Sequence, residues 1–203
     1  TVRAIVSAID LESGRERETA RLDLDDHEGP SAVAFSPRGD VLFVATRGTN
    51  RVDAFDVATG RVLANFGTAF TPDGLVVVGD HMFVKGFLAR AIAVHDVSGL
   101  LNGTDGVVRA VTEVVTLDAE PLDPQVLAGK RIFHDAASRR MSLDGYVACS
   151  SCHPGADTTG GPGTSPTEGR ACAIRSISEA GAAPVTVRCI GRRTSTRSRT
   201  RPL

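Results

Sequence analysis

Apolar runs rich in β-branched residues recur along the first half of the chain, and each is bounded by Gly, Asn, Asp or Pro. This pattern is typical of strands separated by tight turns, because β-branched side chains favour an extended backbone and the four bounding residues favour turns. The runs are VLFVAT (41–46), RVDAFDVATG (51–60), LVVVGDHMFVKG (75–86) and AIAVHDVSG (91–99). The sequence therefore predicts a mainly β region over residues 1–115.

Two short patterns repeat within this region. SAIDLESG, DAFDVATG and AVHDVSG share an Asp, an aliphatic residue and a turn that ends in Gly, which aligns Asp10, Asp56 and Asp96. FSPRGDVLFVA and FTPDGLVVV likewise share Phe, Ser or Thr, Pro and Gly ahead of an expected strand. The aligned Asp residues lie 46 and 40 residues apart, a spacing that suits one four-stranded propeller blade per repeat. A small β-sandwich is the alternative.

The repeat resembles the YVTN-type β-propeller family, in which the strand ending in FDVATG closes a hairpin within the blade. The resemblance implies that residues 1–115 form about two and a half blades. A closed propeller ring needs four or more blades, so the expected fold is a partial β-propeller.

After residue 115 the pattern changes to that of a helix. DPQVLAGKRIFHDAA (123–137) begins with Asp123 as the N-cap and Pro124 at the first helical position. Apolar residues then recur at spacings that a helix would bury on one side. They are Val126, Leu127, Ile132 and Phe133. We expect a truncated α-helical domain over residues 116–158.

This second region contains two cysteines, Cys149 and Cys152, directly followed by His153. Two thiols at this spacing can each form a thioether with a haem vinyl group, and the adjacent imidazole can then ligate the iron. A redox dithiol would require a βαβ setting, which the region lacks. A zinc site requires four ligands, and the chain's other two cysteines, Cys172 and Cys189, lie at no zinc-finger spacing. The motif predicts covalent haem c with His153 as the proximal iron ligand.

The segment GKRIFHDAASRRMSLDGYVACSSCHPGAD (129–157) resembles the first haem site of the di-haem cytochrome c peroxidase superfamily. The shared features are a Gly-x-x-hydrophobic-Phe helix end, an Arg-hydrophobic-Ser step, an Asp-Gly turn and the haem motif. The resemblance places Arg139, Arg140 and Ser142 near the mouth of the haem site. His134 stands where the family more often has an aromatic residue or Asn, and Met141 is a candidate sixth ligand.

The resemblance implies an extracytoplasmic, periplasmic c-type cytochrome that takes part in electron transfer. Its parent would be a di-haem peroxidase-like oxidoreductase, with a second haem encoded only in the full-length protein and an electron-donor or acceptor protein or small redox molecule as partner. We expect this chain to be incomplete and without peroxidase turnover. Two alternatives stay open: a mono-haem electron carrier, and a propeller-based binding module without haem.

Charge and composition set the last part of the chain apart. Residues 161–203 contain eight Arg, two Glu and no Lys or aromatic residue. A basic nucleic-acid-binding tail is the conventional interpretation, but Arg without Lys, together with Ala, Gly, Pro, Ser and Thr, is typical of a GC-rich gene translated out of frame. If one base was lost near codons 158–160, codons compatible with the tail can be read in the original frame. That reading permits Trp-Asp-Phe and Gly-x-Gly-His-Gly runs, which resemble the continuation of the di-haem cytochrome c peroxidase superfamily in the same order. We therefore expect 159–203 to be an unstructured frameshift product that binds no nucleic acid.

No apolar run in the chain approaches the roughly 20 residues of a membrane span.

Overall fold

The computed structural model describes residues 4–24, 26–140, 142–153, 174–175 and 185–189. In chain order the elements are β1 (Ile5–Asp10), η1 (Glu18–Ala20), β2 (Leu22–Asp23), β3 (Pro30–Phe35), β4 (Val41–Thr46), β5 (Arg51–Asp56), β6 (Val62–Gly67), β7 (Pro72–Val78), β8 (His81–Gly86), β9 (Ala91–Asp96), α1 (Ser98–Leu101), β10 (Arg109–Val115), α2 (Pro124–His134), α3 (Cys149–Cys152), β11 (Ile174–Arg175) and β12 (Val185–Cys189). The fold is mainly β, as the strand pattern predicts. Within these ranges, no helix is long and apolar enough to cross a lipid bilayer.

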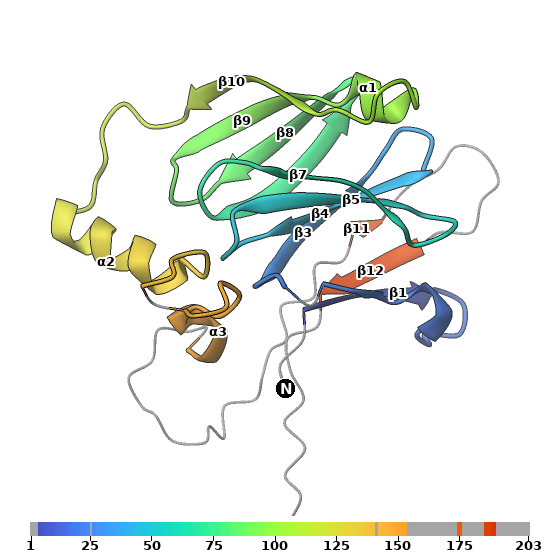
Figure 1. Ribbon diagram of the computed structural model, residues 1–203, viewed down its shortest axis with the longest axis horizontal. Coiled ribbons are helices and arrows are strands. Elements are labelled where there is room, and N and C mark those ends of the chain that lie inside the picture. Colours follow the sequence, from blue (N-terminus) through green and yellow to red (C-terminus); the bar gives the residue numbers. More distant parts are fainter. Residues whose placement is uncertain (1–3, 25, 141, 154–173, 176–184, 190–203) are drawn as a thin grey trace, which may run out of the picture.

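Two four-stranded antiparallel sheets form the centre of the molecule (Figure 1). One contains β3, β4, β5 and β6 in spatial order, and the other contains β7, β8, β9 and β10 in the same order. The first strand of one sheet, β3, contacts the first strand of the other, β7. Consecutive antiparallel strands that form one sheet per repeat, with successive sheets packed together, are the arrangement of neighbouring propeller blades. The chain therefore forms a partial β-propeller.

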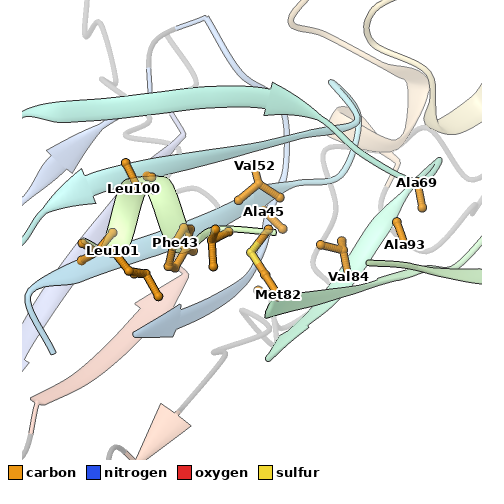
Figure 2. Close-up of a cluster of buried hydrophobic side chains, with 13 residues drawn as sticks. Phe43, Ala45, Val52, Ala69, Met82, Val84, Ala93, Leu100 and Leu101 are labelled. Atoms are coloured by element: carbon orange, nitrogen blue, oxygen red, sulfur yellow. The ribbon is translucent and has the colours of Figure 1, made fainter. Parts of the chain in front are cut away.

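The main hydrophobic core lies between these two blades (Figure 2). Phe43 and Val52 of the first blade and Met82 and Val84 of the second are fully buried there. Burying each such side chain contributes about 1.5–3 kcal/mol. Helix α1 adds Leu100 and Leu101 to the same core. The alternation of inward and outward side chains along each strand thus places one apolar face of each blade in the core.

The repeated Asp residues end equivalent strands of successive blades. Asp10 ends β1, Asp56 ends β5 and Asp96 ends β9. In each case the Asp Oδ1 accepts a hydrogen bond of 2.8 Å from a backbone N–H two or three residues later, which belongs to Ser13, Thr59 or Ser98. Asp is suited to this position because its short carboxylate can cap a turn of its own backbone. The expected register of the Asp repeat is confirmed.

The second repeated pattern does not occupy equivalent positions. FSPRGD forms the turn between β3 and β4, where the Ser36 hydroxyl donates to Asp40 at 2.6 Å. FTPDG leads into β7, which begins at Pro72. Its equivalent is β3, which begins at Pro30 and has the same shift of register within its first residues. The predicted alignment of FSPRGD with FTPDG is therefore wrong by one strand, since it matches the start of β4 with the start of β7. The two segments look alike because Pro and Gly occur both in turns and at the edge positions of strands.

The strands β1 and β2 belong to a third sheet, whose order is β11-β12-β1-β2. β12 pairs with β1 in antiparallel register, with Val185 opposite Asp10 and Cys189 opposite Val6. The prediction of a wholly unstructured tail is therefore wrong for 174–175 and 185–189. The segment 185–189 is VTVRC, which alternates apolar and polar residues and is rich in β-branched side chains, as is typical of a strand. This short pattern was missed because the composition of the surrounding tail is atypical of folded structure. The rest of the tail, including Cys172 and the proposed change of frame, lies outside the described residues.

Helix α2 begins as predicted, with Asp123 as N-cap accepting a 2.8 Å hydrogen bond from Gln125 N–H and Pro124 as first residue. None of its residues is fully buried, however: Val126 is 50% and Ile132 is 53% exposed, and Leu127 and Phe133 are half-buried. The expectation that α2 buries these residues on one side is therefore wrong for Val126 and Ile132. The two helices α2 and α3 lie to one side of the blades (Figure 1) and do not by themselves form a cytochrome domain.

Candidate functional site

The CSSC segment forms the single helical turn α3, and His153 follows as its C-cap. Cys149 and Cys152 are three positions apart, so their side chains project from neighbouring positions on the turn. Both are free thiols and both are exposed. The backbone N–H of His153 donates to the Cys149 carbonyl at 2.9 Å, and the exposed imidazole has no hydrogen bond within the described ranges. The motif therefore presents two thiols and one imidazole to solvent from one turn.

Ser151 connects this turn to the propeller. Its hydroxyl accepts a 2.9 Å hydrogen bond from the backbone N–H of Ala148, the N-cap residue of α3. The same hydroxyl donates to the Glu28 carboxylate at 2.9 Å. Glu28 lies in the loop between β2 and β3, 123 residues earlier in the chain. A single side chain thus caps α3 and attaches it to a propeller loop.

A second connection runs through Gly48, in the turn between β4 and β5. Its N–H donates to the Glu28 carbonyl at 3.1 Å, and its carbonyl accepts from the Ala136 N–H at 2.9 Å. A Cβ atom on Gly48 would lie 2.9 Å from Glu28 Cδ and 3.1 Å from Ala136 Cβ. A side chain at position 48 would therefore displace the Glu28 carboxyl from its place beside Ser151 and crowd Ala136.

Burial raises the pKa of the Glu28 carboxyl above its ordinary value, because ionisation is disfavoured away from water. The hydrogen bond from Ser151 and the positive charge of Arg47 oppose this effect by stabilising the carboxylate. Burial likewise lowers the pKa of His134, and the charges of Arg47 and Lys130 lower it further. The junction between propeller and helices is thus a partly buried polar region, in which burial disfavours the charged forms of Glu28 and His134.

Four buried polar atoms at this junction have no hydrogen-bond partner among the described residues. They are Glu28 Oε2, Arg47 Nε, His134 Nδ1 and Ser150 Oγ. Buried polar groups are nearly always paired, often with ordered water. The junction therefore gathers unpaired polar atoms from both the propeller and the helical region.

The resemblance predicts that Arg139, Arg140 and Ser142 lie near the mouth of the haem site, and these residues differ in their exposure to solvent. Arg139 and Arg140 are exposed. Ser142 is buried, and its hydroxyl accepts hydrogen bonds from Gly145 N–H at 3.1 Å and Val147 N–H at 3.4 Å. Its role in the described chain is to shape the loop before α3. Met141 lies outside the described residues.

The residues present fit a covalently attached haem. Both thiols are accessible, and three of the apolar side chains that precede them are exposed: Ile132 is 53%, Val147 is 45% and Leu143 is 88% exposed. A porphyrin needs apolar side chains of this kind against its faces. No group of three or more His, Cys, Asp or Glu side chains within the described ranges could hold a metal ion directly.

Sequence reasoning missed Glu28, Gly48 and Ser151. Glu28 and Gly48 lie within the region interpreted as propeller, where charged and glycine residues are common in loops. Ser151 lies between the two cysteines, at a position that the haem motif leaves variable. No local signal links them, because the contact joins segments far apart in the chain.

Comparisons with known proteins give structural likeness only. No protein-family model matches the chain, and no curated protein matches it. The Cps50 (Swd1) β-propeller domain of Myceliophteria thermophila is 18% identical over 47% of this chain and 34% of its own, with a TM-score of 0.41. BamB from Moraxella catarrhalis is 18% identical over 56% of this chain and 30% of its own, with a TM-score of 0.42. A protein from Lactobacillus plantarum is 21% identical over 55% of this chain and 36% of its own, with a TM-score of 0.44.

The chain spans between about a quarter and about two fifths of the length of the solved structures that it resembles. At this identity and TM-score, the likenesses say nothing about what the chain does. Its two complete blades and the strands of a third define it as a partial β-propeller.

Proposed function

We propose that this chain is the haem-attachment part of a c-type cytochrome that takes part in electron transfer. The observation that carries the proposal is the geometry of α3, which presents the free, exposed thiols of Cys149 and Cys152 on one turn that ends at His153. Cys149 and Cys152 would hold the haem covalently, and His153 would be its proximal ligand. When bound, the haem would supply one-electron redox chemistry at its iron.

The attachment is redox-neutral. Each thiol adds across one vinyl double bond, so that a carbon–sulfur bond forms and the thiol hydrogen moves to the other vinyl carbon. The mass of the chain therefore increases by the full mass of one haem. The exposed Ile132, Leu143 and Val147 would pack against the porphyrin, which removes their apolar surface from water.

The wider setting of this function follows from the resemblance of residues 129–157 to di-haem peroxidase-like oxidoreductases. In the parent protein, electrons would pass between the haem held here and a second haem encoded elsewhere. The partner would be an electron-donor or acceptor protein or a small redox molecule. Attachment of haem c takes place outside the bacterial cytoplasm, so an extracytoplasmic, periplasmic location is part of the proposal.

The proposal is tested by expressing the chain together with haem-attachment machinery and recording its intact mass and its pyridine haemochrome spectrum. We expect the mass of one haem and the spectrum of two thioether bonds. Cys149→Ser and Cys152→Ser should each remove one thioether, and the double variant should carry no haem. Cys172→Ser and Cys189→Ser are matched controls, since they remove thiols outside the motif.

An apo mass for the wild-type chain would contradict the proposal. It would favour the other function that the fold supports, a propeller-based binding module whose Cys-x-x-Cys-His segment receives no haem. The two complete blades are the observation behind that alternative.

A further inference from the structure

We infer that Glu28, on the propeller, is a positioning residue that holds the Cys149–Cys152 turn in place for haem attachment. The inference rests on the proposed function and extends it, because it makes the propeller part of the haem site. Glu28 contacts neither cysteine in the proposed role and acts through Ser151.

The first argument is that α3 cannot hold its own shape. It is a single turn of four residues, and isolated helices shorter than about 12 residues are marginal in water because nucleation is costly. A turn that presents two thiols at fixed spacing therefore needs support from the rest of the protein. The hydroxyl of Ser151 supplies it by capping Ala148 N–H and bonding Glu28 at once.

The second argument is that the helical region is bonded to three propeller loops, which precede β3, β5 and β9. Ser151 donates to Glu28 in the loop before β3. The Ala136 N–H donates to Gly48 in the turn between β4 and β5 at 2.9 Å. The Arg131 guanidinium donates to the Leu88 carbonyl, in the turn between β8 and β9, at 3.3 Å. Of these three contacts, only the bond to Glu28 reaches α3 itself.

The third argument is that Glu28 is itself held in position. Its side chain is buried, with 9% of the residue exposed. Its backbone carbonyl accepts from Gly48 N–H, and its carboxyl lies where any Cβ on Gly48 would collide with it. A hydrogen bond to a group already fixed by burial restricts its partner more than a bond to a mobile surface side chain. Glu28 is therefore a rigid support for Ser151.

The chain offers a matched control one residue away. Ser150 is adjacent to Ser151 in the same turn, and its hydroxyl has no hydrogen-bond partner among the described residues. Ser150→Ala thus makes the same chemical change within α3 without breaking the link to Glu28. Any effect shared by both serine variants reflects helix propensity, and any effect of Ser151→Ala alone reflects the link.

The experiment is amide hydrogen exchange on the full chain without haem, for the wild type and the variants Glu28→Ala, Glu28→Gln, Ser151→Ala and Ser150→Ala. We expect exchange of the amides of residues 148–153 to accelerate about tenfold or more in Glu28→Ala and Ser151→Ala, the loss typical of a hydrogen bond to a charged or polar acceptor. Exchange in β3, β4 and β5 should not change. Glu28→Gln should recover part of the protection, because its amide oxygen can still accept from Ser151. The double variant Glu28→Ala/Ser151→Ala should be no faster than the faster single variant.

Unchanged exchange at residues 148–153 in both alanine variants would overturn the inference. An equal acceleration across β3, β4 and β5 would also overturn it, because Glu28 would then stabilise the propeller as a whole. Equal effects of Ser150→Ala and Ser151→Ala would show that the link to Glu28 is irrelevant.

Haem attachment provides the second measurement. In co-expression with haem-attachment machinery, Glu28→Ala and Ser151→Ala should yield a smaller fraction of haem-bearing chains than Ser150→Ala, with Glu28→Gln in between. If the wild type is fully modified and the Glu28 variants are modified equally, the inference is wrong and the proposed function stands. If the wild type carries no haem, the proposed function itself is wrong and the inference falls with it, whatever the exchange data show about the Glu28 contact.

Discussion

Glu16 and Glu28 illustrate how the surroundings of a single residue set its charge in this protein. Glu16 accepts two hydrogen bonds from the Arg21 guanidinium, at 2.8 and 2.6 Å, and one from the Ser7 hydroxyl at 2.7 Å. The hydrogen bonds from Arg21 and then Ser7 lower the pKa of Glu16 to about 2. Burial raises the pKa of Glu28 instead. The pKa values of the two carboxyl groups shift in opposite directions because hydrogen-bond donors stabilise a carboxylate, whereas burial destabilises it.

Glu16 should therefore make the stability of the chain depend on pH. Its pKa is lowered from 4.5 to about 2 in the folded chain, so its contribution is present above about pH 4.5 and is lost as the pH falls towards about 2. We expect the Tm of the wild type to fall over this range by more than the Tm of Glu16→Gln, as measured by thermal melts followed by circular dichroism. Glu12→Gln is the control, since its side chain makes no hydrogen bond in the described part of the chain. Parallel curves for the wild type and Glu16→Gln would contradict this prediction.

At the scale of the elements, the same Asp-capped turn closes successive hairpins. Asp56 accepts from both the N–H and the hydroxyl of Thr59, at 2.8 and 2.7 Å. Gly60 follows with a φ of 69°, a left-handed conformation that glycine adopts without steric cost. Asp10 and Gly14 form the same turn after β1. Short segments of this kind depend on contacts within a few residues, which explains why the pattern is visible in the sequence.

Replacing Asp56 tests this turn directly. Asp56→Ala removes both hydrogen bonds from Thr59, so we expect the Tm to decrease by a few degrees and exchange of the β5 and β6 amides to accelerate. Asp56→Asn should have a smaller effect, because its side-chain oxygen still accepts from the backbone. A Tm of Asp56→Ala equal to that of the wild type would show that the cap does not stabilise the hairpin.

At the scale of the whole molecule, the partial propeller leaves one face of its last blade without a neighbour among the described residues. Val76 is 50% exposed and Val78 is 61% exposed on β7. Val76, Phe83 and Ile92 line an apolar hollow of about 250 Å³ on this blade. Val77, between the two exposed valines, packs against the core shared with the other blade. The alternation along β7 therefore separates a core face from an open apolar face.

Lysine substitutions at neighbouring positions should distinguish the two faces. Val77→Lys places a charge against the core and should reduce the free energy of unfolding by about 2 kcal/mol or more. Val76→Lys should leave the free energy of unfolding nearly unchanged and reduce the binding of an apolar fluorescent dye such as anilinonaphthalene sulfonate. Urea denaturation and dye titration measure the two effects. A larger loss of stability for Val76→Lys than for Val77→Lys would contradict the assignment of faces.

Several features of the fold were predictable because they depend on local chemistry. Asp10, Asp56 and Asp96 mark equivalent turns, and Asp123 with Pro124 marks the start of α2. The repeat of FSPRGD and FTPDG misled the prediction, because the same residue types serve a turn in one blade and a strand start in the next. The exposure of Val126 and Ile132 was not predictable, since an apolar helical face shows only that burial would be favourable, not that another element covers it.

The sequence by itself determined the strand alternation, the Asp-capped turns, the helix start and the presence of two cysteines followed by His153. All of these depend on residues within a few positions of one another, where spacing alone sets the geometry. The tertiary structure alone decided that Ser151 bonds Glu28 and that Gly48 allows the two segments to approach. Contacts between residues 123 positions apart depend on how blades and helices pack, and that packing is a property of the whole fold.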